Sequence, residues 1–465
     1  MNNRYESPLS MRYASAEMTQ LFSADSRYTT WRKLWVSLAR AERALGLPIT
    51  QEQIDALTAH VSDIDYRVVR EREKIVRHDV MAHIYAYGLA APEAAGIIHL
   101  GATSCFVTDN ADLILYRDAL HLIRKGVVRV IARLSAFAEA YKHLPTPGYT
   151  HYQAAQFVTV GKRACLWMQD YVSDLADLDY LLAHFPFLGC RGATGTEASF
   201  LALFDSDGGK VDEMNRRIAA DFGFTECFSV CGQTYPRKTD SRILNVLSLI
   251  AQSAYRMAED IRLLQHDGQL EEPFGTSQVG SSAMAYKRNP VRCERICSLA
   301  RYVMNDAANA AQTAAVQWLE RSLDDSAIRR IAMPEGFLAC NAILRLADSV
   351  IGGLTVKETV IAAATDAELP RVATENLLMA AVRQGADRQR AHEVIRRAAM
   401  GAKHPSDLLG MLANEPELHL TSEQIQTVLD PAAYTGRCVE QVERFLEKTA
   451  ALTADADCAP DNIDV

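Results

Sequence analysis

Apolar side chains recur along most of the chain at the three- and four-residue spacings of an α-helix. The longest run lies within 113–141 and alternates between the two spacings without a break: Leu113, Tyr116, Leu120, Ile123, Val127, Val130, Leu134, Phe137 and Tyr141. Such a stripe is the seam of a heptad repeat and predicts a helix that packs lengthwise against others. At about 1.5 Å per residue this helix extends roughly 40 Å. Pro145, Pro147 and Gly148 then end it.

Two further long patterns follow, over residues 239–270 and from about 291 to 320. The first places Leu244, Leu247 and Ala251 on one face, and the second is rich in alanine. Small side chains let helix axes approach closely, so both segments are typical of the interior of a helix bundle. We find no strand pattern of any length and no glycine-rich dinucleotide fingerprint. The pattern therefore predicts an all-α fold.

Shorter helical patterns flank the long ones. Residues 31–45 carry an apolar stripe closed by Gly46, Thr50 and Gln53 form a capping box, and residues 64–90 again read as helix. Helices become shorter after about residue 356. The chain length of 465 residues suggests two or three domains. We expect an N-terminal helical domain, a central long-helix bundle and a small C-terminal helical domain, over residues 1–104, 105–356 and 357–465.

Composition narrows the class of protein. Hydrophobic residues make up 49% and charged residues 23% of the chain, as in ordinary globular proteins, and no run of about 18 apolar residues predicts a membrane span. The N-terminus lacks the apolar core of a signal peptide, and the ten cysteines show no zinc spacing, so we expect a reduced, cytoplasmic protein. The formal net charge of −9 argues against nucleic acid as a partner. An anionic substrate would therefore need a local cluster of Arg and Lys.

Three loops between the helical patterns carry polar residues suited to chemistry. The longest, 272–290, is punctuated by proline and glycine and so is not expected to be helical. It ends in Lys287, Arg288 and Asn289, just before a helix that begins at Pro290. Cations beside a helix N-terminus suit the binding of an anion. A solvated linker is the alternative interpretation.

The other two loops are 99–104, with adjacent hydroxyl groups at Thr103 and Ser104, and 149–156, with His151. We expect His151 to lie just before a helix. An imidazole there can donate a proton near pH 7, whereas a capping or surface histidine is the simpler alternative.

A further cluster combines two arginines and a serine. Ser326 and Arg330 are four residues apart and share a helix face, and Arg321 lies close before them. Two guanidinium groups and a hydroxyl can hold a phosphate through charge-assisted hydrogen bonds. The alternative is a salt-bridged surface turn that involves Asp324 and Asp325.

The segment Gly280-Ser-Ser-Ala-Met-Ala-Tyr-Lys-Arg-Asn-Pro290 resembles the signature loop of the fumarase/aspartase superfamily, G-S-S-x-M-P-x-K-x-N-P. Residues 101–104 and 150–156 resemble its other two conserved regions, in the same order. Ala285 and Ala154 stand where the family usually has Pro, so we expect both loops to be more mobile than usual. Within the superfamily the chain resembles the branch that cleaves adenylosuccinate, in the form found in animals, over residues 7–15, 77–83, 95–104, 281–295 and 323–330.

The resemblance implies the elimination of fumarate from a succinylated amine of a nucleotide, with no metal or organic cofactor. It makes Ser281 the base that removes a proton beside a carboxylate, while Lys287 and Asn289 stabilise the resulting carbanion. A serine can act in this way only if cations, backbone N–H groups and the exclusion of water lower its pKa. His151 matches the general acid that protonates the leaving nitrogen, and Glu294 matches the residue that orients its ring.

Further residues match substrate-binding positions of the family. His78 is expected to hydrogen-bond the substrate near the reacting bond, and Thr103, Ser104 and Gln233 to hold the succinyl carboxylates. The remaining positions, most of them suited to the nucleotide and its phosphate, are Arg12, Tyr13, Arg77, Asp79, Arg295, Arg321, Ser326 and Arg330. The implied substrates are adenylosuccinate, giving AMP, and SAICAR, the succinyl-carboxamide ribotide of purine synthesis, giving AICAR.

The resemblance also implies a homotetramer in which each site is built from three subunits. The three loops lie at ends of long helices and could not readily all meet within one chain, which agrees with shared sites. Two other readings remain open at this point. One is another fumarate-releasing lyase of the superfamily, such as one that acts on argininosuccinate, and the other is a non-catalytic helical scaffold.

Overall fold

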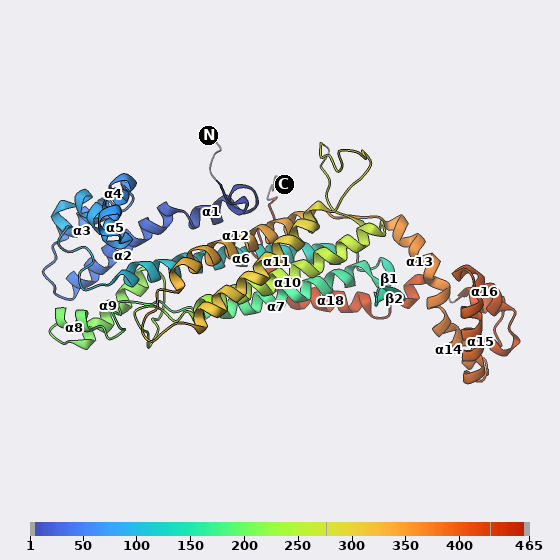
Figure 1. The fold of residues 1–465 in the computed structure, drawn as a ribbon. Helices are drawn as coiled ribbons and strands as arrows, with labels where there is room; N and C mark the ends of the chain where they lie inside the picture. The colour runs from blue at the N-terminus through green and yellow to red at the C-terminus, as the bar shows by residue number, and fades with distance from the viewer. Residues whose placement is uncertain (1–4, 276, 428, 460–465) are drawn as a thin grey trace.

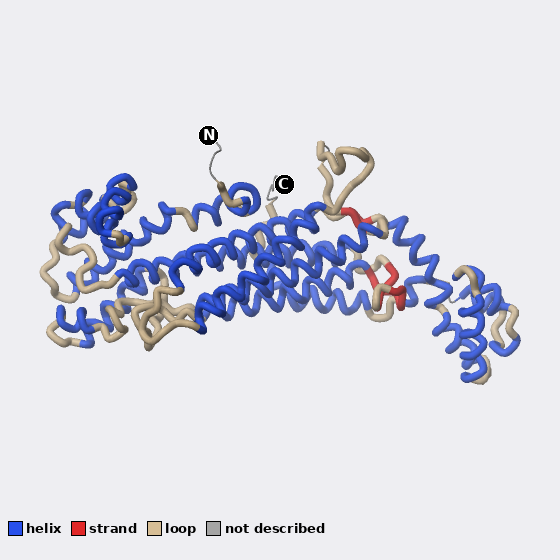
Figure 2. The backbone as a smooth tube through the Cα atoms, viewed as in Figure 1, coloured by secondary structure: helices blue, strands red, loops and turns tan. Residues whose placement is uncertain are grey.

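The computed structural model describes residues 5–275, 277–427 and 429–459 of the chain. Figure 1 shows an elongated molecule, with a bundle of long helices in the middle and smaller helical groups at the two ends. Figure 2 shows that helix dominates the described part of the chain. The predicted all-α fold is confirmed. The bundle consists of α6 (Ser104–Ala140), α7 (Val160–Ala183), α10 (Lys238–His266), α11 (Val291–Ala315) and α12 (Asp325–Gly352).

The heptad stripe of the first long helix forms part of the core of this bundle. Leu113, Leu120 and Ile123 of α6 have no exposed surface. α6 packs against α7 and α12, and α11 packs against both α10 and α12. All three long helices predicted from the sequence are present. The third ends at Ala315, shorter than expected, because the chain turns before α12 begins.

Most of the N-terminal helices gather at the end of the bundle where α6 begins, whereas the first two elements, within residues 9–21, lie along the side of the bundle (Figure 1). Gly46 adopts φ +103° after α2, and Thr50 and Gln53 form the expected capping box of α3. The single helix expected over 64–90 is wrong in one respect. Arg77 adopts φ 51° and ends one helix, and the His78 side chain caps the next. The elements are η1 (Leu9–Tyr13), α1 (Ala16–Leu21), α2 (Ala24–Ala44), α3 (Gln51–Ala59), α4 (Tyr66–Val76), α5 (Asp79–Ala90) and η2 (Pro92–Ala94).

An antiparallel hairpin of β1 (Pro145–Thr150) and β2 (Gln153–Thr159) follows α6 at the opposite end of the bundle. The expectation that His151 directly precedes a helix was therefore wrong. His151 forms the hairpin turn with Tyr152, and both have positive φ, 53° and 57°, as the mirror-image turns of tight hairpins require. β1 is rich in proline and glycine, so no alternating pattern marks it as a strand.

The remaining elements complete the two ends. α8 (Ala198–Leu203) and α9 (Gly208–Asp221) lie beside the N-terminal helices, and β3 (Leu270–Glu271) pairs with β4 (Thr355–Val356). A separate C-terminal group with its own apolar core contains α13 (Glu358–Val372), α14 (Thr374–Arg383), α15 (Arg388–Gly401), α16 (Pro405–Ala413), η3 (Pro416–Leu418), α17 (Ser422–Thr427) and η4 (Pro431–Tyr434).

The last described helix, α18 (Cys438–Thr449), leaves the C-terminal group and packs against α7 and α6 of the bundle. η5 (Ala450–Thr453) follows it and contacts α6. The chain therefore returns to the bundle after the C-terminal group. None of the helices in the described ranges combines the length and apolar character needed to cross a bilayer.

Candidate active site

A cavity of about 270 Å³ lies at the end of the bundle where α6, α10 and α12 begin. Helices α2 and α5 close it from the N-terminal side. The residues predicted from the sequence that line it are His78, Asp79, Ser104, Gln233, Arg321, Ser326 and Arg330. Segments far apart in the chain thus meet here, and they bring together several of the substrate-binding residues that the resemblance implied.

His78 and Ser104 form the hydrogen-bonding side of this cavity. Nδ1 of His78 accepts from the backbone N–H of Met81 at 3.4 Å, which caps α5. Nε2 of the same ring lies 3.2 Å from Oγ of Ser104, within hydrogen-bond distance. Both side chains remain accessible, so they can exchange this contact for one with a ligand.

Two of the predicted arginines already pair with carboxylates. Arg330 lies 3.2 Å from Asp79, and Arg321 contacts Asp325 at 3.0 Å. The expected alternative, a turn salt-bridged by Asp325, is thus partly correct for Arg321. Ser326 lies in the first turn of α12 and lines the cavity beside both.

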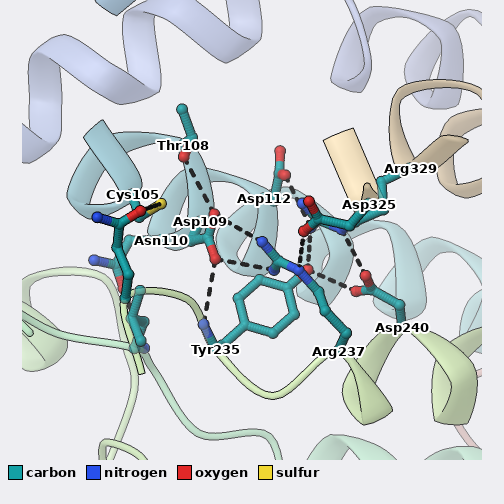
Figure 3. Close-up of polar contacts among 12 residues, drawn as sticks. Cys105, Thr108, Asp109, Asn110, Asp112, Tyr235, Arg237, Asp240, Asp325 and Arg329 are labelled. Atoms are coloured by element: carbon teal, nitrogen blue, oxygen red, sulfur yellow. Dashed lines mark hydrogen bonds and ion pairs between the residues drawn. The ribbon is translucent and has the colours of Figure 1, made fainter. Parts of the chain in front are cut away.

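A network of buried charges lines the inner part of the cavity (Figure 3). Arg237, just before α10, contacts Asp109 of α6 at 2.9 Å and also pairs with Asp325 at the start of α12. Asp325 is fully buried, and it also holds Arg321. Burial alone would raise the pKa of Asp109. The positive charges of Arg237 and Arg329 outweigh this effect and hold the pKa below its ordinary value. Arg237 therefore fixes the ends of three helices relative to one another.

Arg329 forms the second half of the network. It reaches Asp240 of α10 at 2.6 Å and Asp112 of α6 at 3.1 Å, and it also contacts the hydroxyl of Tyr235. That hydroxyl donates to Asp240 at 2.6 Å. Because buried charges are tolerated only when paired, these contacts give the cavity a rigid floor.

Sequence reasoning missed this network and one wall of the cavity. One wall of the cavity is formed by residues of α2, namely Arg27, Tyr28 and Trp31. The sequence did contain a signal for this wall of the cavity, because Arg27 lies four residues before Trp31 and so shares its helix face. The charged residues Asp109 and Asp112 likewise precede the apolar stripe of α6, where uncompensated charge would be costly.

Thr103 and Arg77 do not line the cavity, although they neighbour residues that do. Thr103 is the residue before the first turn of α6, and Arg77 is exposed at the end of α4.

His151 lies far from this cavity. It is exposed at the hairpin tip, beside Tyr152, whose hydroxyl donates to Asp267 at 3.4 Å. The hairpin follows the last turn of α6, and Ser104 is in its first turn. α6 has 37 residues, so about 55 Å separates its two ends. Ser104 and His151 of one chain therefore cannot reach one small substrate.

The signature loop emerges at the same end of the bundle as the hairpin (Figure 1). Oγ of Ser281 accepts hydrogen bonds from the backbone N–H groups of Ala283 and Met284, at 3.2 and 3.1 Å. Such donors favour a negatively charged oxygen. Lys287 is exposed, and the amide of Asn289 donates to the carbonyl of Gly280 at 2.8 Å. Thr276 of this loop lies outside the described residues.

Glu272 links the two ends of the signature loop. Its carboxylate accepts from the backbone N–H groups of Arg292 and Cys293, at 2.9 and 3.0 Å. These N–H groups belong to the first turn of α11, the helix N-terminus that the sequence marked as suited to an anion. In the folded chain the carboxylate of Glu272 is the anion that they bind. Burial raises the pKa of Glu272 above its ordinary value, although the hydrogen bonds from Arg292 and Cys293 act to lower it.

Glu294 and Arg295 follow in the first turns of α11. Glu294 is exposed, and no hydrogen bond or ion pair joins it to His151 within the described part of the single chain. Arg295 lies over the ring of Tyr13, 5.6 Å from its centroid, and Arg12 lies 5.9 Å from the same ring. Nη1 of Arg295 is buried without a hydrogen-bond partner in the described part of the chain. These three residues form a third cluster, close to the signature loop and suited to an anion.

Comparison with known proteins identifies the family. The family described as "Lyase" matches residues 13–305, and the family described as "Adenylosuccinate lyase C-terminus" matches residues 370–445. The adenylosuccinate lyase of Schizosaccharomyces pombe is 49% identical over 96% of this chain and 94% of its own. That of Saccharomyces cerevisiae is 48% identical over 96% and 95%, and that of Schistosoma mansoni 45% identical over 98% and 97%.

Solved structures agree on the fold. A fumarate lyase from Mesorhizobium sp. BNC1 superimposes with a TM-score of 0.82 at 26% identity, covering 96% of this chain and 99% of that one. The 3-carboxy-cis,cis-muconate lactonizing enzyme from Pseudomonas putida has a TM-score of 0.85 at 24% identity with the same coverage, which supports the fold alone. With matches along nearly its whole length, the chain belongs to the adenylosuccinate lyase family of the fumarase/aspartase superfamily.

Proposed function

We propose that this protein releases fumarate from adenylosuccinate, giving AMP, and from SAICAR, giving AICAR. The observation that carries the proposal is the cavity itself. Arg321, Ser326 and Arg330 line it on one side, as a phosphate requires, and Ser104 and His78 line it on another. Both substrates carry a phosphate at one end of the molecule and a succinyl dicarboxylate at the other. The C–N bond that holds the succinyl group is the bond that breaks. Membership of the family supports the same reaction.

The reaction needs a base, an electron sink and an acid. Ser281 removes a proton from the carbon next to a succinyl carboxylate, and the electron pair spreads into that carboxylate. Lys287 and Asn289 stabilise the charge there. The C–N bond then breaks, fumarate forms, and His151 gives its proton to the departing nitrogen. The two N–H groups on Ser281 Oγ support the role of the base, since they favour its alkoxide.

We further propose that each site combines residues from three subunits of a homotetramer. The length of α6 supports this, because Ser104 and His151 of one chain lie at its opposite ends. Exposed apolar side chains on the turn before α12 support assembly as well. Trp318, Leu319 and Leu323 are 74%, 96% and 72% exposed in the single chain, which is unusual for a surface that stays in water. Glu294 would meet His151 across such an interface.

We place the protein in the cytoplasm. All ten cysteines are free thiols in the described residues, and most are buried, as in proteins of a reducing compartment.

The test is turnover by the purified protein. Adenylosuccinate is followed by ultraviolet absorbance, and fumarate is measured separately. We expect AMP and fumarate in equal amounts, and kcat lower by about 10²–10⁴-fold in Ser281→Ala and His151→Ala. Turnover of argininosuccinate in place of adenylosuccinate would overturn the proposal. Wild-type kcat in Ser281→Ala would remove the assignment of the base.

A further inference from the structure

The charged side chains that line the cavity are almost all paired with one another. Arg330 pairs with Asp79, and Arg321 pairs with Asp325. Arg237 pairs with Asp109 as well as with Asp325, and Arg329 pairs with Asp112 and Asp240. Every cavity-lining aspartate is thus engaged by one of these four arginines. Their charges are compensated before any substrate arrives.

Arg27 is the exception. Arg27 lines the cavity from α2 and is half-buried. No hydrogen bond or ion pair reaches its guanidinium group within residues 5–275, 277–427 and 429–459. It still acts on the cavity electrostatically, because its charge opposes the rise that burial causes in the pKa of Asp112. A half-buried guanidinium without a partner is costly, and an anionic ligand would compensate it.

We propose that Arg27 binds an anionic oxygen of the substrate. The inference rests on the proposed function, since it is the nucleotide phosphate or a succinyl carboxylate that supplies the oxygen. Arg330 and Arg321 must share their charge with Asp79 and Asp325, whereas Arg27 offers all its donors. Neighbouring Tyr28 is held in place by stacking on His83, with ring centroids 3.9 Å apart. The wall that carries Arg27 is therefore ordered before the substrate binds.

The experiment compares full-length Arg27→Met, Arg27→Lys and Lys33→Met with the wild type. Lys33 is a matched control, because it lies on the same helix, is exposed and does not line the cavity. We expect Arg27→Met to raise KM for adenylosuccinate at least about tenfold while kcat changes less than about threefold, as loss of a charged hydrogen bond in binding would do. Arg27→Lys should recover most of the affinity, and Lys33→Met should match the wild type.

Calorimetry with AMP and with fumarate, each alone, identifies which oxygen is bound. If Arg27 holds the phosphate, only AMP binds more weakly to Arg27→Met; if it holds a carboxylate, only fumarate does. Unchanged KM and unchanged binding of both ligands in a folded Arg27→Met would overturn the proposal. Arg27→Gln replaces it if the Met variant does not fold. A wild type that binds AMP but never turns over adenylosuccinate would refute the proposed function, while the binding comparison would still test Arg27.

Discussion

At the scale of single residues, Glu42 has an unusual environment for a carboxyl group. It is fully buried in α2, and neither of its oxygens has a hydrogen-bond partner among the described residues. Burial raises its pKa to about 8, from an ordinary value of 4.5. The folded protein therefore holds a proton at neutral pH that the unfolded chain has released.

This difference predicts how stability depends on pH. Between about pH 4.5 and 8 Glu42 binds fewer protons in the unfolded chain than in the folded protein, so its contribution to the free energy of unfolding falls as pH rises, by up to about 1.4 kcal/mol per pH unit. Above about pH 8 this contribution is constant. We expect Glu42→Gln to remove this contribution from the pH dependence and to be more stable than the wild type at pH 8. Thermal unfolding of both proteins at pH 5, 6.5 and 8 measures this difference in pH dependence.

Glu17→Gln is the control for this comparison, because Glu17 is exposed on α1. It should keep the wild-type slope. Equal pH dependence in Glu42→Gln and the wild type would show that Glu42 finds a partner or water in solution.

At the scale of elements, the heptad stripe and the two other long apolar patterns were sufficient to predict α6, α10 and α11, because these signals are local. The β1–β2 hairpin could not be predicted in this way. Its first strand contains Pro145, Pro147 and Gly148, and packing against α13 stabilises it. The same limit applies to the site. Motifs located the loops, but Arg237 meets Asp325 and Asp109 from 88 and 128 residues away, and no local pattern specifies such pairing.

The Glu272 contact predicts how the signature loop is held. Its carboxylate joins the start of the loop to the first turn of α11, which follows the end of the loop. Gln265 adds a second link, since it accepts from the N–H of Glu272 and donates to the carbonyl of Arg288. We expect Glu272→Gln to lower kcat at least about tenfold with a smaller change in KM, because Lys287 lies between these anchors. The lost cap should also cost about 0.5–2 kcal/mol of stability.

Steady-state kinetics and thermal unfolding check this expectation, with Glu271→Gln as the matched control. Glu271 pairs with Arg288 and Lys357 but does not cap the helix, so its loss should have a smaller effect on kcat. An unaltered kcat in Glu272→Gln would mean that the loop is positioned by other contacts.

At the scale of the whole molecule, the length of α6 separates the proposed acid from the cavity, so activity should depend on assembly. Ser281→Ala and His151→Ala are each expected to be inactive. If a site takes its serine and its histidine from different subunits, random exchange gives about one site in four with both residues intact. We therefore expect an equal mixture of the two variants, after subunit exchange, to recover about a quarter of wild-type turnover.

The informative control is a mixture of Ser281→Ala with Lys287→Ala. Both residues lie on the same loop of the same chain, so every loop in that mixture carries a defect and no exchange can assemble a complete one. Recovery in the first mixture and none in the second would require that the loop and the hairpin come from different chains. Recovery in neither, with exchange verified by mass, would instead require a rearrangement that brings the hairpin and loop of one chain together.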